Sequence, residues 1–195
     1  LFQHPNIGPF LGRQLIQRLV TSNPSPAYIG RVSAAFADNG RGVRGDLKAV
    51  IRAVLLDPEA RSVAQLASPT FGKLKEPYLR TTGLARAFNA RSKSGLYPLS
   101  YLEEFHAQQP LSSPSVFNFF RPGHSPAGPI SDAHLVAPEF QILNAVTAVA
   151  VPNYYYQVMR DGFNRWGDAN PARVVRASLT AEFALYNDIP ALMRR

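Results

Sequence analysis

The sequence contains no cysteine. Disulfide bonds, catalysis by a cysteine thiolate and metal sites built from thiolates are therefore excluded. Because a chain without cysteine suits both reducing and oxidising surroundings, this absence leaves the compartment open.

A membrane-spanning segment and a signal peptide are also missing from the sequence. No apolar run approaches the roughly 20 residues that a membrane-spanning helix needs. The patterned sequence opens directly with Leu1, Phe2 and Gln3, without a leader before them. A start without methionine is typical of a fragment. We therefore expect residues 1–195 to be a single helical domain that belongs to a larger protein.

Charged residues are scarce, at 17% of the chain, whereas proline is abundant, with 17 residues. This combination is typical of well-buried helices joined by long loops that proline stiffens. The net charge of +8 is compatible with an anionic partner. The basic residues are spread thinly along the chain, however, and this distribution argues against nucleic acid as that partner.

Apolar residues recur at helical spacing in several segments. Asn6, Ser25 and Asp46 are the expected N-caps of the first three helices. The last long segment, residues 136–161, is expected to be the longest helix, kinked or split by Pro152. The other expected elements are helices from residue 77 and over residues 99–107 and 180–186, and a strand or turn at residues 174–175. The sequence therefore predicts an all-α fold, an irregular bundle of about six or seven helices.

A long Pro/Gly-rich loop, residues 111–139, interrupts this helical pattern. It carries His124, Asp132 and His134, and Glu139 follows at the start of the next helical pattern. Imidazole and carboxylate groups in one loop can bind a divalent metal or act as an acid/base pair. Their spacing matches no standard zinc signature. The structural alternative is that Asp132 caps a turn and that Glu139 stabilises a helix start through the helix dipole.

Glu76 and Glu139 form a second candidate pair, because each lies beside a proline at an expected helix start. Two carboxylates that face a cleft can hydrolyse a glycosidic bond, one as the acid and the other as base or nucleophile. Glu103 and Glu104 are alternative sources of a carboxylate. The structural alternative is again stabilisation of two helix starts.

Aromatic side chains are concentrated at three places in the second half of the chain. When exposed they stack on sugar rings or nucleobases, and when buried they pack the loop onto the long helix. The three adjacent tyrosines of residues 154–156 cannot all face inward on a helix, so at least one should be exposed. The set consists of Phe117, Phe119, Phe120, Tyr154, Tyr155, Tyr156 and Trp166.

Arginine residues provide a fourth candidate site. Arg13 and Arg18, with Arg41 and Arg44 of a glycine-containing loop, have the chemistry to bind phosphate or carboxylate. The alternative is that they are solvated surface charges. The sequence contains neither a phosphate-binding Gly-x-x-x-x-Gly-Lys loop nor a Gly-x-Ser-x-Gly nucleophile elbow.

An ordered series of motifs resembles one large bacterial family, the domain-of-unknown-function family numbered 1800. The motifs are HPNIGPFLGRQLIQRLVTSNPSPAYIGRV, GVRGDLKAVIRAVLLDPEAR, KLKEPYLR, SPSVFNFFRPGHSPAG and LVAPEFQIL. They cover nearly the whole chain and correspond to the C-terminal half of that family. The resemblance implies a helical protein of the bacterial periplasm or exterior, encoded beside a partner protein. It supplies no catalytic residue.

Two functions are compatible with these observations. The first is a binding or interaction module of an exported bacterial protein, whose apolar surface meets a protein partner or a missing N-terminal half. The second is a hydrolase that acts on polysaccharide or ester bonds along residues 121–139. For the hydrolase the expected catalytic residues are Glu76, Glu139 and His134, and the expected binding residues are Arg121, His124, Asp132, Tyr155 and Trp166. We expect no cofactor and no bound metal. Binding of an anionic polymer is a weaker third hypothesis.

Overall fold

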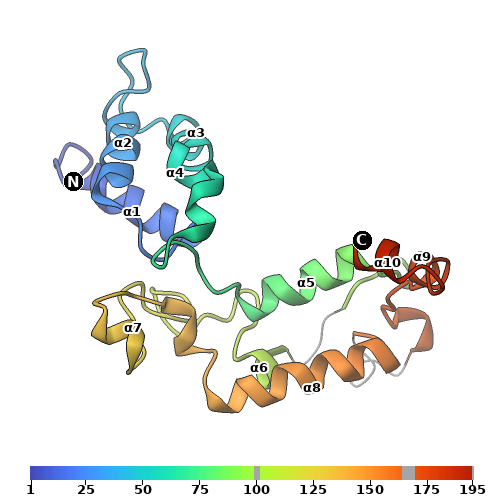
Figure 1. The fold of residues 1–195 in the computed structure, drawn as a ribbon. Coiled ribbons are helices and arrows are strands. Elements are labelled where there is room, and N and C mark those ends of the chain that lie inside the picture. The colour runs from blue at the N-terminus through green and yellow to red at the C-terminus, as the bar shows by residue number, and fades with distance from the viewer. Residues whose placement is uncertain (99–101, 164–169, 195) are drawn as a thin grey trace. The chain divides into compact units, whose positions relative to one another are not determined.

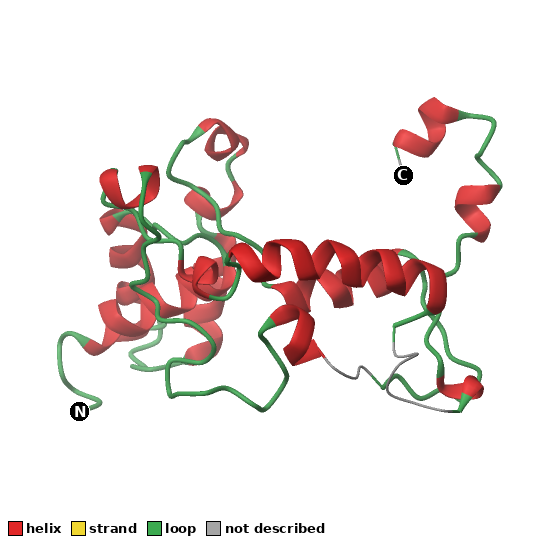
Figure 2. Ribbon diagram, turned by 90° about the horizontal axis from the view of Figure 1, so that it is seen from below, coloured by secondary structure: helices red, strands yellow, loops and turns green. Residues whose placement is uncertain are grey.

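The computed structural model describes residues 1–98, 102–163 and 170–194. Over these residues the chain is helix and loop, without a β-strand, which confirms the predicted all-α fold (Figure 1, Figure 2). None of the described helices is long and apolar enough to cross a membrane. The chain divides into two compact units, residues 1–74 with 120–141 and residues 75–119 with 142–195.

Three helices packed around one apolar core form the first unit. They are α1 (Ile7–Leu19), α2 (Pro26–Ala37) and α3 (Leu47–Leu56), followed by the short α4 (Pro58–Arg61) and the 3-10 helix η1 (Val63–Ala67). The buried core consists of Ile16, Tyr28, Val32, Phe36, Val50 and Val54. These residues recur at the helical spacing seen in the sequence, so the burial of one stripe from each helix holds this unit together.

Two of the expected N-caps are confirmed in the first unit. The Ser25 side chain accepts a hydrogen bond from the Tyr28 N–H, and the Asp46 side chain accepts from the N–H groups of Lys48 and Ala49. Asn6 precedes α1 as expected, but its side chain makes no capping hydrogen bond.

Close contact between α1 and α2 depends on two glycines. A Cβ atom on Gly12 would lie 3.1 Å from Val32 Cγ1, and one on Gly8 would lie 2.7 Å from Ser33 Oγ. Both distances are shorter than ordinary van der Waals contact, so larger residues at these positions would separate the two helices.

Residues 120–141 return to the first unit and include the short helices α7 (Pro129–Asp132) and η2 (Pro138–Gln141). The Asn23 side chain binds the backbone of Val136 twice, because its Nδ2 donates to the carbonyl and its Oδ1 accepts from the N–H, both at 2.9 Å. Phe120 is buried, and the guanidinium of Arg18 lies over its ring at 4.4 Å. Side-chain hydrogen bonds and one aromatic anchor therefore hold this irregular segment.

The second unit contains the longest helix, α8 (Ala145–Asp161), together with α5 (Pro77–Ala87) and the short α6 (Leu102–His106). Toward the C-terminus follow η3 (Pro171–Arg173), α9 (Thr180–Phe183) and α10 (Ile189–Met193). The buried core consists of Ala90, Leu102, Tyr154, Val158, Phe163 and Val175. Instead of the expected strand or turn at residues 174–175, an isolated antiparallel bridge joins Arg91 and Arg176 through two backbone hydrogen bonds of 2.9 Å.

The predicted helix over residues 136–161 is wrong in its first third. After η2 the chain leaves the helical path, and α8 starts only at Ala145 because Asn144 caps it. The Asn144 side chain accepts from the N–H groups of Val146 and Thr147, while Thr147 Oγ1 accepts from the Asn144 N–H at 2.9 Å. This reciprocal capping favours a helix start at this point. Pro152 lies inside α8 and does not split it.

Candidate functional site

Glu139, the central carboxylate of the predicted loop site, is buried in the first unit. Its side chain is 1% exposed and forms an ion pair with Lys73, with a distance of 3.0 Å between Lys73 Nζ and Glu139 Oε1. Lys73 Nζ also donates a hydrogen bond of 2.9 Å to the Arg18 carbonyl. Neither Glu139 oxygen has a hydrogen-bond partner among the described residues, so the ion pair with Lys73 is what ties η2 to the segment after η1.

The other polar residues of the loop do not gather around Glu139 as a metal site. His124 is half-buried, while Asp132 and His134 are exposed. Within the described ranges no three histidine, aspartate or glutamate side chains are arranged to hold a metal ion. Arg121 is exposed, and its backbone N–H donates to Gln141 Oε1 at 2.8 Å. The polar side chains of the loop therefore do not form a common site with Glu139 among the described residues.

A pocket of about 440 Å³ does lie along this loop, within the first unit. Its loop side is apolar, formed by Ile130, Leu135, Val136, Ala137 and Phe140, and its other side includes Ser22, Asn23, Thr70 and Lys73. None of the predicted acid/base residues lines it as far as the structure is described. Lys73 is the one ionisable side chain in this described lining, and its charge already faces Glu139.

Glu76, the second predicted carboxylate, belongs to the other unit. It precedes α5 but makes no capping hydrogen bond. Instead its Oε2 accepts from Gln108 Nε2 at 2.5 Å, and Gln108 Oε1 accepts from the Tyr78 N–H at 3.2 Å. Gln108 thus joins the segment after α6 to the start of α5, and Glu76 is part of that junction. Trp166 lies outside the described residues.

A buried polar group that the sequence did not single out lies between α5, α6 and α8. Thr81 Oγ1 is 2.6 Å from His106 Nε2 and 3.3 Å from the Tyr155 hydroxyl, and it donates to the Pro77 carbonyl at 3.1 Å. His106 is completely buried, and the ring of Tyr154 meets it edge-on at 4.7 Å. No motif marks His106 or Thr81, since His106 ends a helix of only five residues.

Burial controls the ionisation of this group. Desolvation, and to a lesser extent the positive charge of Arg80, lower the pKa of His106 to about 4. Burial also raises the pKa of Tyr154. At neutral pH His106 is therefore a neutral imidazole.

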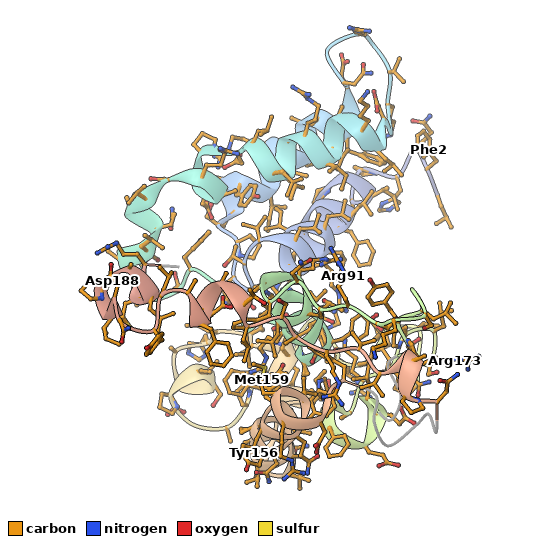
Figure 3. The ribbon with its side chains drawn as sticks, turned by 90° about the vertical axis from the view of Figure 1, so that its right-hand side faces the viewer. Phe2, Arg91, Tyr156, Met159, Arg173 and Asp188 are labelled. Atoms are coloured by element: carbon orange, nitrogen blue, oxygen red, sulfur yellow. The ribbon has the colours of Figure 1, made fainter. Side chains whose placement is uncertain are left out.

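Beside this group, α5 and α8 enclose a second pocket, of about 520 Å³. Leu84, Ala87, Phe88 and Met159 form its apolar wall, and Lys75, Arg80, Gly83 and Tyr155 complete the lining. Figure 3 shows Met159 on the side of α8 that is turned toward α5, and Tyr156 on a different side of the same helix. Among the described residues of this lining, Tyr155 is the one that was predicted to bind a ligand.

The face of α8 that carries Tyr156 is exposed and largely apolar. Val146 is 75% exposed, Val149 64% and Tyr156 67%. The buried residues of α8, among them Val151, Tyr154 and Val158, lie on a different face. The expectation that at least one of the three tyrosines is exposed is confirmed by Tyr156.

The remaining candidates take part in local packing. Phe117 is 52% exposed, whereas Phe120 is buried, with Arg18 over its ring. Arg44 lies 4.9 Å from the centre of the Phe36 ring and donates to the carbonyls of Phe2 and His4. Arg44 therefore holds the N-terminal segment of the first unit.

Comparison with known proteins identifies the family. Residues 1–189 match the family described as "Protein of unknown function (DUF1800)". Because the match covers essentially the whole chain, the chain belongs to this family, as the resemblance of its motifs predicted. No curated protein and no solved structure matches the chain.

Proposed function

We propose that this member of the DUF1800 family is a binding module that docks a protein partner on the exposed face of α8. The observation that carries the proposal is the exposure of Val146, Val149 and Tyr156 on one side of this helix. Residues three, seven and ten positions apart return to the same side of an α-helix, so the three side chains form a single stripe, in which Asn153 is the exposed polar residue. An exposed apolar stripe of this kind is typical of a protein–protein interface.

The composition of α8 supports the same proposal. No charged residue occurs from Ala145 to Tyr156. Arg160 is the first charge in the helix, and its guanidinium lies over the Tyr156 ring, 5.6 Å from the ring centre. The smaller residues beside the stripe, Ala148 and Pro152, are exposed as well. Interface centres are depleted in charged residues and enriched in aromatic ones, and tyrosine is among the residues that most often dominate binding energy.

The alternative function, a hydrolase with its site along residues 121–139, draws less support. Glu139 is buried in an ion pair with Lys73, and the loop side of the neighbouring pocket is apolar. Glu76 is held by Gln108 in the other unit. Export from a bacterial cell stays a prediction made from the family resemblance.

A charge on the exposed stripe tests the proposal. The chain is immobilised and used to capture proteins from an extract of its host, as wild type, as Val149→Glu and as the control Val116→Glu. Val116 is 96% exposed in the 111–139 loop, so the two variants add the same charge at exposed valines. We expect Val149→Glu to weaken capture of a specific protein at least about tenfold, because a charge at an interface centre is desolvated without a partner.

The control variant should capture that protein like wild type, and both variants should keep the wild-type melting temperature, since exposed substitutions change stability little. Capture that is equal for Val149→Glu and Val116→Glu would refute docking on α8. Concentration-dependent self-association of purified wild type, absent in Val149→Glu, would identify the partner as a second copy of the chain.

A further inference from the structure

The C-terminal end of α5 forms a further pocket in the second unit. The Asn89 N–H donates a hydrogen bond of 3.1 Å to the Arg86 carbonyl, and the Ala90 N–H donates one of 2.8 Å to the Ala85 carbonyl. Asn89 has a φ of 45°, in the left-handed region. Together these features are the Schellman arrangement of a helix end, which folds the chain back beside the last turn of α5. The pocket at this place has a volume of about 400 Å³, which is within the size range of small-molecule sites.

The base of this pocket is apolar and is held by backbone hydrogen bonds. Ala85, Ala90 and Val175 belong to its lining, and Ala90 and Val175 are buried in the core of the second unit. Two backbone hydrogen bonds of 2.9 Å between Arg91 and Arg176 hold the segment that carries Val175 beside the end of α5. Because the three lining side chains are short, they leave room above them for a flat apolar group.

Two arginines lie at this pocket, and both are accessible. Arg86 is on α5 and Arg91 follows the helix end, and both side chains are exposed, so a ligand oxygen can reach their guanidinium groups. Arg91 Nη1 donates to the Ala90 carbonyl at 3.4 Å, which keeps this guanidinium near the base of the pocket. The described lining contains no aspartate or glutamate, and neither arginine takes part in an ion pair within the described part of the chain. A pocket lined by charges of one sign attracts a ligand of the opposite sign, here an anion.

The two positive charges match a phosphate monoester. Such a group carries a charge of about −1.5 to −2 at neutral pH, whereas a carboxylate carries a single charge and would neutralise only one guanidinium. Arginine is also well suited to phosphate, because its planar fork of donors matches two phosphate oxygens. Asn89 belongs to the same lining, and its exposed side-chain amide is a further donor.

Tyr97 indicates the chemistry of the rest of the ligand. It is 50% exposed and lines the pocket together with the apolar base. An aromatic ring bound beside a tyrosine gains from stacked or edge-on contact in addition to the burial of apolar area. An alkyl group would gain only the burial. The lining therefore favours a ligand that joins an aromatic ring to a phosphate.

We propose that this pocket binds the phosphate monoester of a small aromatic alcohol. The phosphate oxygens accept hydrogen bonds from the guanidinium groups of Arg86 and Arg91 and from the Asn89 amide. The aromatic ring lies on the apolar base, against the ring of Tyr97. No residue of α8 occurs in the described lining, so this site is separate from the exposed stripe of α8 and does not depend on partner docking.

Phenyl phosphate is the probe for this proposal. Titration calorimetry with the full chain, in a buffer without phosphate, should give saturable binding of phenyl phosphate. Phenyl sulfate has nearly the same shape but a single negative charge, and we expect it to bind at least about tenfold more weakly, because its charge neutralises only one guanidinium. Inorganic phosphate lacks the ring and should also bind at least about tenfold more weakly. Equal affinity for phenyl sulfate or for inorganic phosphate would overturn the proposal.

Arg86→Met and Arg91→Met each keep an apolar stem and remove the donors, and each should weaken binding of phenyl phosphate at least about tenfold. Both arginines are exposed, and the bridge from Arg91 to Arg176 uses backbone atoms, so both variants should keep the wild-type melting temperature. The matched control is Lys93→Met, which removes an exposed charge from the same segment, outside the described lining, and should bind like wild type. Undiminished binding by both arginine variants, or an equal loss in Lys93→Met, would overturn the assignment.

Two variants of Tyr97 test the position of the aromatic ring. Tyr97→Phe should bind phenyl phosphate like wild type, whereas Tyr97→Ala should bind it at least about threefold more weakly and bind inorganic phosphate unchanged. An equal loss for both ligands would overturn the placement of the ring against Tyr97.

The separation of this site from the exposed stripe of α8 is tested with the same proteins. Val149→Glu should bind phenyl phosphate like wild type, and Arg91→Met should capture the protein partner like wild type. Loss of both functions in either variant would overturn the separation of the two sites.

Discussion

Replacement of Lys73 by methionine would leave the Glu139 carboxylate 1% exposed and without a cation beside it. Removal of one partner from a buried ion pair costs about 3–5 kcal/mol, because the remaining charge is neither solvated nor paired. The hydrogen bond from Lys73 Nζ to the Arg18 carbonyl is lost as well, and it contributes about 1 kcal/mol. We therefore expect the free energy of unfolding of the first unit to fall by about 4 kcal/mol.

The reverse substitution should be milder. Glu139→Gln removes the negative charge, but the Lys73 side chain is 14% exposed and keeps its hydrogen bond to Arg18. A loss of about 1–2 kcal/mol is expected. In the double variant both charges are gone, so it should be more stable than Lys73→Met alone by about 2 kcal/mol.

Urea unfolding followed by circular dichroism measures these differences for the whole chain. Amide hydrogen exchange of peptides from residues 7–37 and 120–141 assigns them to the first unit, which is needed because two units can unfold separately. Lys73→Met could lower the free energy of unfolding by less than about 1 kcal/mol, or the double variant Lys73→Met/Glu139→Gln could be no more stable than Lys73→Met. Either result would show that Lys73 does not stabilise the Glu139 carboxylate. Glu139 would in that case again be a candidate acid or base.

Two further predictions concern the second unit. Because the pKa of His106 is lowered from 6.5 to about 4, the folded chain binds fewer protons than the unfolded chain between these values. The neutral ring therefore contributes up to about 3 kcal/mol above pH 6.5, and this contribution is lost as the pH falls toward 4. Urea unfolding at several pH values should show wild type losing stability relative to His106→Gln over this range, and parallel curves would contradict the burial of a neutral ring. Asn144→Ala should lower stability by about 1 kcal/mol and speed amide exchange in the first turn of α8, whereas Asn153→Ala, at an exposed site in the same helix, should do neither.

The parts of the fold that could be predicted from the sequence are those fixed by neighbouring residues. Ser25 and Asp46 cap helices through atoms two or three residues away, and the core positions of α2 follow from helical spacing alone. The start of α8 was missed although its signal is equally local. The apolar pattern of residues 136–144 continues across Asn144, and the capping pair with Thr147 outweighs that pattern.

The candidate sites were harder to predict because their contacts are distant in sequence. The sequence groups Glu139 with His134, five residues before it, whereas its ion-pair partner Lys73 is 66 residues away in the sequence. His106 and Thr81 are 25 residues apart and meet only through packing.

The three consecutive tyrosines explain why α8 lacks an ordinary amphipathic pattern. Successive residues of an α-helix are rotated by about 100°, so Tyr154, Tyr155 and Tyr156 face three directions. Tyr154 is buried in the core, Tyr155 lines the pocket beside α5, and Tyr156 is exposed. In α3 the exposed residues include Lys48 and Arg52 as well as three leucines, Leu47, Leu55 and Leu56. The exposed side of α8 carries Val146, Val149 and Tyr156, with the uncharged Asn153 between the last two. Docking of the proposed partner would remove these apolar side chains from water.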